Sequence, residues 1–311
     1  MINIENFLEK YYKKNEKIIL ACSTWPDSMF LLYSILKTPY KDNLIVCYFN
    51  HKLRDNSDNE ERFLEDLWKE KWFEVEIWSC DIKKLQKDSI SVSIEELARK
   101  KRYEFLFNIQ KKYSCPYIIT AHHLDDKIET FFFNLCRWTK LSGLINMVLV
   151  SWNILRPLIK TKKTDILKYL EENNLEYKID ETNFEDDYTR NLLRNKIIPN
   201  FEKINNKYKE NISNTIDYLE DIKDFIDKEV KSFLSNYESS FFSINDFNSK
   251  SLFLKKEIIR YIYFISNWNS TIWLTSKNID EILKFIKSKW NKTKKEIKKL
   301  SMFKDSDKIY Y

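Results

Sequence analysis

Short apolar runs and longer amphipathic stretches alternate along the first half of the chain. The apolar runs have the length of buried strands, and the stretches between them have the 3.6-residue period of helices that pack on one side. Strands are expected at Ile18–Cys22, Leu44–Phe49, Phe73–Ile77 and Tyr117–Thr120. Helices are expected at Asp27–Leu36, Glu60–Lys71, Ile94–Tyr113 and Asp126–Cys136. This order predicts an α/β fold, a parallel sheet with helices on both faces.

Three loops of this predicted sheet are candidates for a binding site. They follow Cys22, Phe49 and Thr120, and each leaves the carboxyl end of a strand. Ligands of open parallel sheets bind at these strand ends. The three loops are therefore expected to meet at one edge of the sheet.

The second half of the chain has a different pattern. A helix is expected over Thr164–Asn173, with Thr164 as its N-cap, because a threonine hydroxyl can accept a hydrogen bond from the first helical turn. From Lys203 the pattern is helical and rich in lysine, and strand signals are weak until about Phe241. A chain of 311 residues favours two domains. We expect the first over residues 1–205 and a smaller, mainly helical one over residues 206–311.

The composition departs from the average in its glycine content. The chain has one glycine, Gly143, and nine tryptophans, whereas an average usage of roughly 7% would give about 20 glycines. No fold class accounts for this deficit.

Positive charge gathers near the end of the chain. The net charge is +6, and eight lysines but only one glutamate lie between Lys284 and Lys299. A basic patch of this kind suits a nucleic-acid partner, and a solvated lysine-rich face is the alternative.

The cysteines and the lengths of the apolar stretches indicate in which cellular compartment the protein is found. The five cysteines are scattered singly without a C-x-x-C pair, which disfavours a zinc site or an iron–sulfur cluster. Isolated thiols suit a reducing cytosol. The N-terminus lacks the pattern of a signal peptide, and no apolar stretch is long enough to span a membrane. The sequence thus predicts a cytoplasmic protein without a membrane partner.

The loop Ser23–Ser28 has the position of a phosphate-binding loop, between the first strand and the first helix. Its serines and successive backbone amides could hold an anion at the N-terminus of that helix. Such loops need glycine, because amides approach an anion closely only where no side chain intervenes. Trp25 occupies that place here, and the loop is not a Walker A sequence. An ordinary N-cap at Asp27 or Ser28 is the alternative.

The segment Thr120–Thr130 runs from a strand end into a helix. Asp126 and Glu129 are three residues apart, so their carboxylates lie on one helical face, where they can bind a cationic amine or a magnesium ion. An acidic first turn, favoured by the helix dipole, is the alternative. His122 and His123 point apart at a strand end and no H-E-x-x-H motif is present, so we expect no metal on these histidines.

Each motif alone is weak, but their combination and order are specific for one family. In these motifs the chain resembles the tRNA(Ile)-lysidine synthases, members of the PP-loop ATP pyrophosphatase superfamily. That family carries T-A-H-H-x-D-D-x-x-E-T, which Thr120–Thr130 matches in full. Its S-G-G-x-D-S, N-H-x-L-R and E-x-A-R-x-x-R-Y motifs correspond to Ser23–Ser28, Asn50–Arg54 and Glu96–Tyr103. Its R-G-x-x-x-x-G-L, R-P-L and D-x-(S/T)-N…R-N-x-x-R…P tracts correspond to Arg137–Leu144, Arg156–Leu158 and Asp180–Pro199. The resemblance covers about residues 15–200, and the rest looks like the family's short form.

The resemblance implies an enzyme that uses ATP and Mg²⁺ to join free lysine to C2 of the wobble cytidine in a CAU-anticodon isoleucine tRNA. It implies a helical tRNA-binding part after a PP-loop catalytic domain, and it leaves the oligomeric state open, with a homodimer among the options. The implied catalytic residues are Asp27, Arg102, Asp126 and Glu129; the acids would hold the lysine ammonium and the arginine its carboxylate. The implied nucleotide-binding residues are Ser23, Thr24, Trp25, Pro26, Asp27, Ser28, Asn50 and His51. The implied tRNA contacts are Arg137, Arg190, Arg194, Lys294 and Lys295.

Several tryptophans stand where the family pattern or a turn calls for glycine: Trp25, Trp72, Trp138, Trp152 and Trp290. One cause would explain them together, namely a codon written here as tryptophan but read as glycine in the source organism, with UGA the natural candidate. Thr24, at the first glycine of the loop, is not explained in this way and is tolerable only with a negative φ. If Trp25 is real, an impaired enzyme or a tRNA-binding relic is the alternative. Another PP-loop tRNA-modifying enzyme, such as a thiolating one, is a further alternative.

Overall fold

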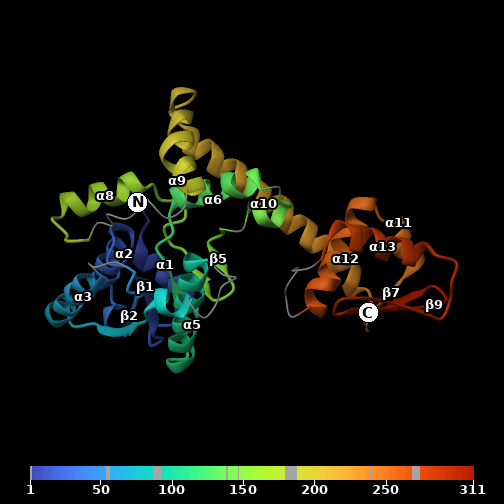
Figure 1. Cartoon of the computed structure of the whole chain (residues 1–311), viewed down its shortest axis with the longest axis horizontal. Helices are drawn as coiled ribbons and strands as arrows, with labels where there is room; N and C mark the ends of the chain where they lie inside the picture. The colour runs from blue at the N-terminus through green and yellow to red at the C-terminus, as the bar shows by residue number, and fades with distance from the viewer. Residues whose placement is uncertain are drawn as a thin grey trace. The chain divides into compact units, whose positions relative to one another are not determined.

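The computed structural model describes residues 2–53, 57–86, 93–137, 139–145, 147–178, 188–237, 240–267 and 274–311. The chain divides into two compact units, one up to Ile216 and one from Asp217 onward. The division falls inside the long helix α10 (Tyr208–Ser235), a little beyond the boundary expected near residue 205. Figure 1 colours the first unit from blue to yellow and the second from yellow to red.

A six-stranded sheet forms the centre of the first unit. Its strand order is β3-β2-β1-β4-β6-β5, and every neighbouring pair is parallel except β5–β6. The strands are β1 (Ile18–Cys22), β2 (Leu44–Asn50), β3 (Glu74–Ser79), β4 (Ile118–Ile119), β5 (Val150–Ser151) and β6 (Ile154–Leu155). The parallel sheet predicted from the alternating pattern is therefore confirmed.

Helices cover both faces of this sheet. The helices of this unit are α1 (Ile4–Tyr11), α2 (Pro26–Leu36), α3 (Ser57–Lys71), α4 (Ile82–Gln86), α5 (Ile94–Lys112), α6 (Leu124–Cys136), α7 (Leu141–Leu144), α8 (Lys163–Glu172) and α9 (Tyr188–Leu192). Successive strand residues point to opposite faces. Ile18 and Leu20 pack with side chains of α1, α2, α3 and α8 in one core. Ile19 packs with side chains of α5 in the other.

The start of α8 differs from the expectation. Its N-cap is Lys162 rather than Thr164, and the cap makes no side-chain hydrogen bond. Instead the backbone N–H of Lys163 donates to Oδ2 of Asp125 at 3.0 Å. The carboxylate of Asp125, at the start of α6, therefore accepts a hydrogen bond from the first turn of α8, as the hydroxyl of Thr164 was expected to do.

Two tryptophans of the first unit have a backbone conformation that favours glycine. Trp72 follows directly after α3 with φ of 58°, and its N–H donates to the carbonyl of Trp68. This is the left-handed C′ position at which helices usually carry glycine. Trp152 has φ of 54° and is the first residue of the two-residue loop between β5 and β6, another place for glycine. The two residues are 86% and 69% exposed, so packing compensates little for the strained backbone.

The second unit is mainly helical, as expected, but it also has a four-stranded antiparallel sheet that the sequence pattern did not reveal. Its helices are the rest of α10, α11 (Ile244–Ser249), α12 (Leu252–Ser266) and α13 (Ser276–Lys287). Its sheet has the order β7-β10-β9-β8, from β7 (Phe241–Ser243), β8 (Thr293–Ile297), β9 (Leu300–Asp305) and β10 (Lys308–Tyr310). Among the described residues of both units, none of the helices combines the length and the apolar character that crossing a bilayer requires.

Candidate active site

A cavity of about 450 Å³ lies at the carboxyl ends of the parallel strands of the first unit. Ser23 follows β1, His51 follows β2 and His122 follows β4, and all three line it. The convergence of the three loops on one edge, expected from the sequence, is confirmed.

The loop after β1 brings the start of α2 to this cavity. The N-cap of α2 is Trp25 and its first residue is Pro26, so the alternative of an ordinary N-cap at Asp27 or Ser28 is wrong. The hydroxyl of Ser28 closes the loop, because it accepts a hydrogen bond from the N–H of Ser23 (3.1 Å) and donates to the carbonyl of Trp25 (3.0 Å). The helix N-terminus lies beside the cavity, where its dipole favours an anion.

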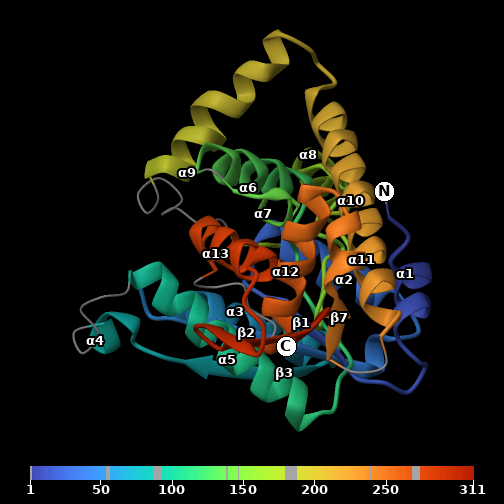
Figure 2. The ribbon, with the colours of Figure 1, turned by 90° about the vertical axis from the view of Figure 1, so that its right-hand side faces the viewer.

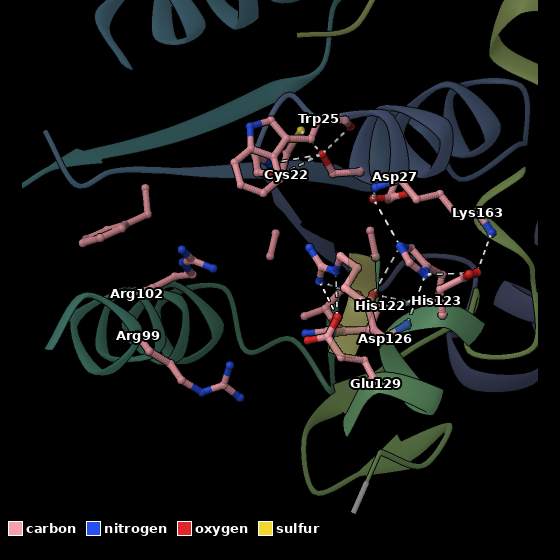
Figure 3. Close-up of a pocket in the computed structure, with 18 of the residues that line it drawn as sticks. Cys22, Trp25, Asp27, Arg99, Arg102, His122, His123, Asp126, Glu129 and Lys163 are labelled. Atoms are coloured by element: carbon pink, nitrogen blue, oxygen red, sulfur yellow. Dashed lines mark hydrogen bonds and ion pairs between the residues drawn. The ribbon is translucent and has the colours of Figure 1, made fainter. Parts of the chain in front are cut away.

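Thr24 does not have the negative φ that was expected of it. Its φ is 64°, in the left-handed region, and its side chain is fully buried. A β-branched residue in this region is a genuine outlier, so the loop keeps the backbone of a glycine loop in spite of the threonine. Its hydroxyl donates to the carbonyl of Ser23 at 2.6 Å. Trp25 itself has φ of −79°, which any residue adopts, but its side chain lines the cavity (Figure 3).

Asp27 and His123 are in contact on one side of the cavity, with Nε2 of His123 3.5 Å from Oδ2 of Asp27 (Figure 3). Burial alone would raise the pKa of Asp27, but the hydrogen bond and charge of His123 and the charge of Lys163 bring that pKa below its ordinary value. Burial alone would lower the pKa of His123, but Asp27 and Asp126 outweigh it, so that pKa is raised. The pair is therefore an ion pair at mildly acidic pH.

The same histidine fixes the start of α6. His123 is its N-cap, and Asp126 returns the bond, since its Oδ2 accepts from the N–H of His123 at 3.0 Å. This reciprocal arrangement is a capping box. His122 behaves differently: its Nδ1 lies 2.9 Å from the hydroxyl of Thr120, and burial lowers its pKa to about 4. The acidic first turn is thus partly structural.

Asp126 and Glu129 lie on one face of α6, as the spacing predicted, and both meet Arg194. The guanidinium of Arg194 donates to Oε2 of Glu129 from Nε at 2.7 Å, and it lies 3.8 Å from Asp126. Arg190 approaches Glu129 to 3.8 Å. Burial nonetheless raises the pKa of Glu129, although Arg194 acts to lower it. Arg190 and Arg194 were expected to contact tRNA phosphates. In the structure they instead approach the acidic pair that was expected to bind an amine.

The opposite wall of the cavity comes from α5. Arg99, Arg102 and Tyr103 line it, and Figure 3 shows the two guanidinium groups on the side of the pocket away from Lys163. The cavity therefore combines a helix N-terminus, an acidic pair and a second cationic wall.

The other expected site residues lie away from the cavity lining. Asn50 is buried and donates to the carboxylates of Asp58 and Glu61. Thr24 and Pro26 shape the loop without lining the cavity. Arg137 is exposed over the ring of Phe133. In the second unit, Lys294 and Lys295 lie on β8 and pair with Glu296 and Glu281. Arg54, Trp138 and residues 179–187 lie outside the described residues.

Sequence reasoning missed two lysines of the site. Nζ of Lys163 lies 3.7 Å from Oδ2 of Asp27, and Lys209 pairs with Asp125. Lys163 starts α8 and Lys209 lies in the first turn of α10, so only the folded chain brings them to the loops. The R-P-L tract shortly before Lys163 is the one nearby signal.

The donor set of the cavity fits a magnesium ion that arrives with a nucleotide. Oδ1 of Asp27 is buried and has no hydrogen-bond partner among the described residues. Mg²⁺ is usually held by one or two carboxylates together with substrate phosphates. The described part of the chain has no cluster of three or more metal-ligating side chains, so phosphate oxygens would have to complete the coordination.

Comparison with known proteins agrees with this geometry. The family model described as a PP-loop domain matches residues 1–201. The U34-tRNA thiolase NcsA from Methanococcus maripaludis has a similar fold, with a TM-score of 0.57 at 19% identity over 68% of this chain and 73% of that one. Fold and site therefore define a protein with a PP-loop ATP-binding domain.

Curated relatives narrow the family. A tRNA(Ile)-lysidine synthase from Borrelia garinii is 33% identical over 85% of this chain, and the match spans 61% of that protein. One from Mycoplasma mycoides is 32% identical over 96% of this chain and 73% of its own length. The chain belongs to the tRNA(Ile)-lysidine synthase family of PP-loop proteins.

Proposed function

We propose that the protein ligates lysine to C2 of the wobble cytidine of a CAU-anticodon isoleucine tRNA. The cytidine O2 attacks the α-phosphate of ATP and releases pyrophosphate; the lysine amine then attacks C2 and displaces AMP. The observation that carries the proposal is the meeting of the α2 N-terminus with the acidic pair Asp126 and Glu129 in one cavity. An anion site for phosphates beside a carboxylate site for an amine is what both steps require.

The nucleotide end of the cavity is the loop Ser23–Ser28. Its amides and the dipole of α2 would hold the leaving pyrophosphate. Asp27 would hold Mg²⁺, which spreads the negative charge of the phosphates when bound. His123 and Lys163 orient the Asp27 carboxylate and add positive charge beside it.

The amine end of the cavity is the start of α6. Asp126 and Glu129 would hold the ammonium of lysine, and Arg102 on the opposite wall its carboxylate. The amine must lose a proton before it attacks. Glu129 suits the role of general base, because burial raises its pKa toward the working range of such groups.

Trp25 is the main obstacle to this function, since an indole in the cavity competes with the phosphates for the helix N-terminus. We infer that glycine stands at this position in the natural protein. The support comes from elsewhere in the chain: Trp72 and Trp152 have left-handed backbone conformations that favour glycine, and both residues are largely exposed, so their side chains pack little. One decoding difference would account for all three. The codons test it, because UGG at positions 25, 72 and 152 contradicts the inference, as does tryptophan found there in peptides of the natural protein.

Lysine transfer is the direct test of the function. Labelled lysine should enter a CAU-anticodon isoleucine tRNA transcript in an ATP-dependent reaction catalysed by the Trp25→Gly protein. A transcript with a different wobble base is the control. Incorporation of sulfur instead of lysine would assign the chain to the thiolating enzymes. If the Trp25→Gly protein binds tRNA but transfers nothing, the tRNA-binding relic is the better description.

Two further features remain predictions. A cytoplasmic location remains a prediction; it agrees with the five cysteines, which are free thiols in the structure. A homodimer would be tested by the mass of the protein in solution.

A further inference from the structure

One face of the sheet in the second unit carries exposed aromatic side chains. Helices α11, α12 and α13 lie on one side of this sheet (Figures 1 and 2), and Leu300 and Met302 of β9 are buried toward them. Strand residues alternate between the faces, so Phe303 and Tyr310 point the other way. Each of these two side chains is 39% exposed.

The other face carries an aromatic row that crosses three of the four strands. Strand register places Lys294, Phe303, Tyr310 and Phe241 side by side on β8, β9, β10 and β7. The ring centroids of Phe303 and Tyr310 are 6.4 Å apart, and those of Tyr310 and Phe241 are 5.6 Å apart. At one end Nζ of Lys308 lies 4.8 Å above the ring of Phe241, and at the other Lys294 follows Phe303.

We propose that this aromatic row binds unpaired RNA bases by stacking, with the single-stranded part of the tRNA as the occupant. Exposed aromatic rings on an antiparallel sheet, bordered by cations that meet phosphates, are the usual platform for single-stranded nucleic acid. Lys294 on β8 supplies that border, and the exposed lysines at the two ends of β8, Lys292, Lys298 and Lys299, add positive charge near it.

The charge around the row favours RNA over a protein partner. Lysine is depleted in the cores of protein–protein interfaces, where large apolar contacts dominate. Here the apolar part is a single row of rings with a lysine near each end, Lys294 beside Phe303 and Lys308 over Phe241. A negatively charged, flat and unpaired ligand matches both the rings and their border.

The proposal rests on the proposed tRNA substrate, so its test measures binding without ATP or lysine. The probe is a labelled single-stranded RNA of about 12 nucleotides, long enough for such a platform, with a duplex of the same length beside it. The full chain should bind the single strand more tightly. Tyr310→Leu should weaken that binding about tenfold, because leucine keeps the apolar volume but loses the stacking ring. Tyr310→Phe keeps the ring and should stay within about twofold.

Tyr218→Leu is the matched control, because Tyr218 is a 67% exposed tyrosine on α10 away from the sheet. It should bind RNA as the parent chain does. Lys294→Gln should lessen the salt dependence of binding by about one counterion. Equal binding of duplex and single strand, or equal loss in the Leu and Phe variants of Tyr310, would overturn the proposal. A failure of lysine transfer leaves this measurement unaffected, so the two proposals fail separately.

Discussion

The two loops that meet at the start of α2 and α6 build the cavity by different means. The Ser23–Ser28 loop offers backbone amides and a helix N-terminus, whereas the Thr120–Thr130 segment offers the side chains of His123, Asp126 and Glu129. A backbone site depends on φ and on the absence of side chains, so one bulky residue can spoil it. A side-chain site depends on residue identity. In this chain the first loop departs from the family pattern at two positions, and the second matches it in full.

The largest expected effect comes from breaking the side-chain site. Glu129→Gln removes the proposed base and one partner of the amine, so lysine transfer should fall by about 10²–10⁴-fold. Release of pyrophosphate in the first step should change much less, because the nucleotide end is untouched. Single-turnover assays of the two steps separate them.

Glu172→Gln, an exposed acid on α8, is the matched control and should keep both steps. An equal loss of both steps in Glu129→Gln would contradict the assignment of Glu129 to the amine.

Repairing the backbone site is the converse experiment. Trp25→Gly clears the indole from the cavity, and ATP affinity measured by calorimetry should rise at least about tenfold, in line with the energy of one or two newly formed phosphate hydrogen bonds. Trp78→Phe, a change on β3 outside the cavity lining, should leave the affinity as it is. Unchanged ATP binding in Trp25→Gly would show that the indole does not obstruct the site.

Glycine should also stabilise the fold where the backbone is left-handed. Trp72→Gly and Trp152→Gly should each raise the free energy of unfolding by about 1 kcal/mol, because a non-glycine residue in this region costs about 1–2 kcal/mol. Trp68→Gly is the control with the opposite sign: Trp68 lies inside α3, where glycine should cost about 1 kcal/mol. Urea denaturation measures all three. Destabilisation by Trp72→Gly would count against a natural glycine there.

The adjacent histidines should respond to pH in opposite ways. The raised pKa of His123 contributes stability that is complete below the ordinary value of 6.5 and is lost as pH rises through the raised value. The pKa of His122 lies at about 4, so its contribution is complete above 6.5 and is lost as pH falls toward 4.

We expect the denaturation midpoint of His123→Gln to fall less than that of the parent chain as pH rises to 9. The midpoint of His122→Gln should fall less than that of the parent chain as pH is lowered to 4. The same profile in both variants would contradict the opposite shifts.

Most of the first unit could be read from its sequence. The strands Ile18–Cys22 and Leu44–Phe49 fall at β1 and β2 because buried parallel strands are continuous apolar runs. The acidic pair on α6 followed from helical spacing. Lys163 and Lys209 could not be found, since their contacts with Asp27 and Asp125 join residues far apart in the chain. The second sheet was missed because β8 is mostly charged and its exposed face leaves little apolar alternation to detect.

Arg194 gives the acidic pocket a resident cation. Under the proposed function, a lysine ammonium that enters there would displace a guanidinium instead of pairing with two carboxylates that have no cation. The electrostatic gain of binding is then only the difference between two cations, and the apparent affinity for lysine reports how readily Arg194 leaves. Removing this competitor would therefore make the free amino acid bind more tightly.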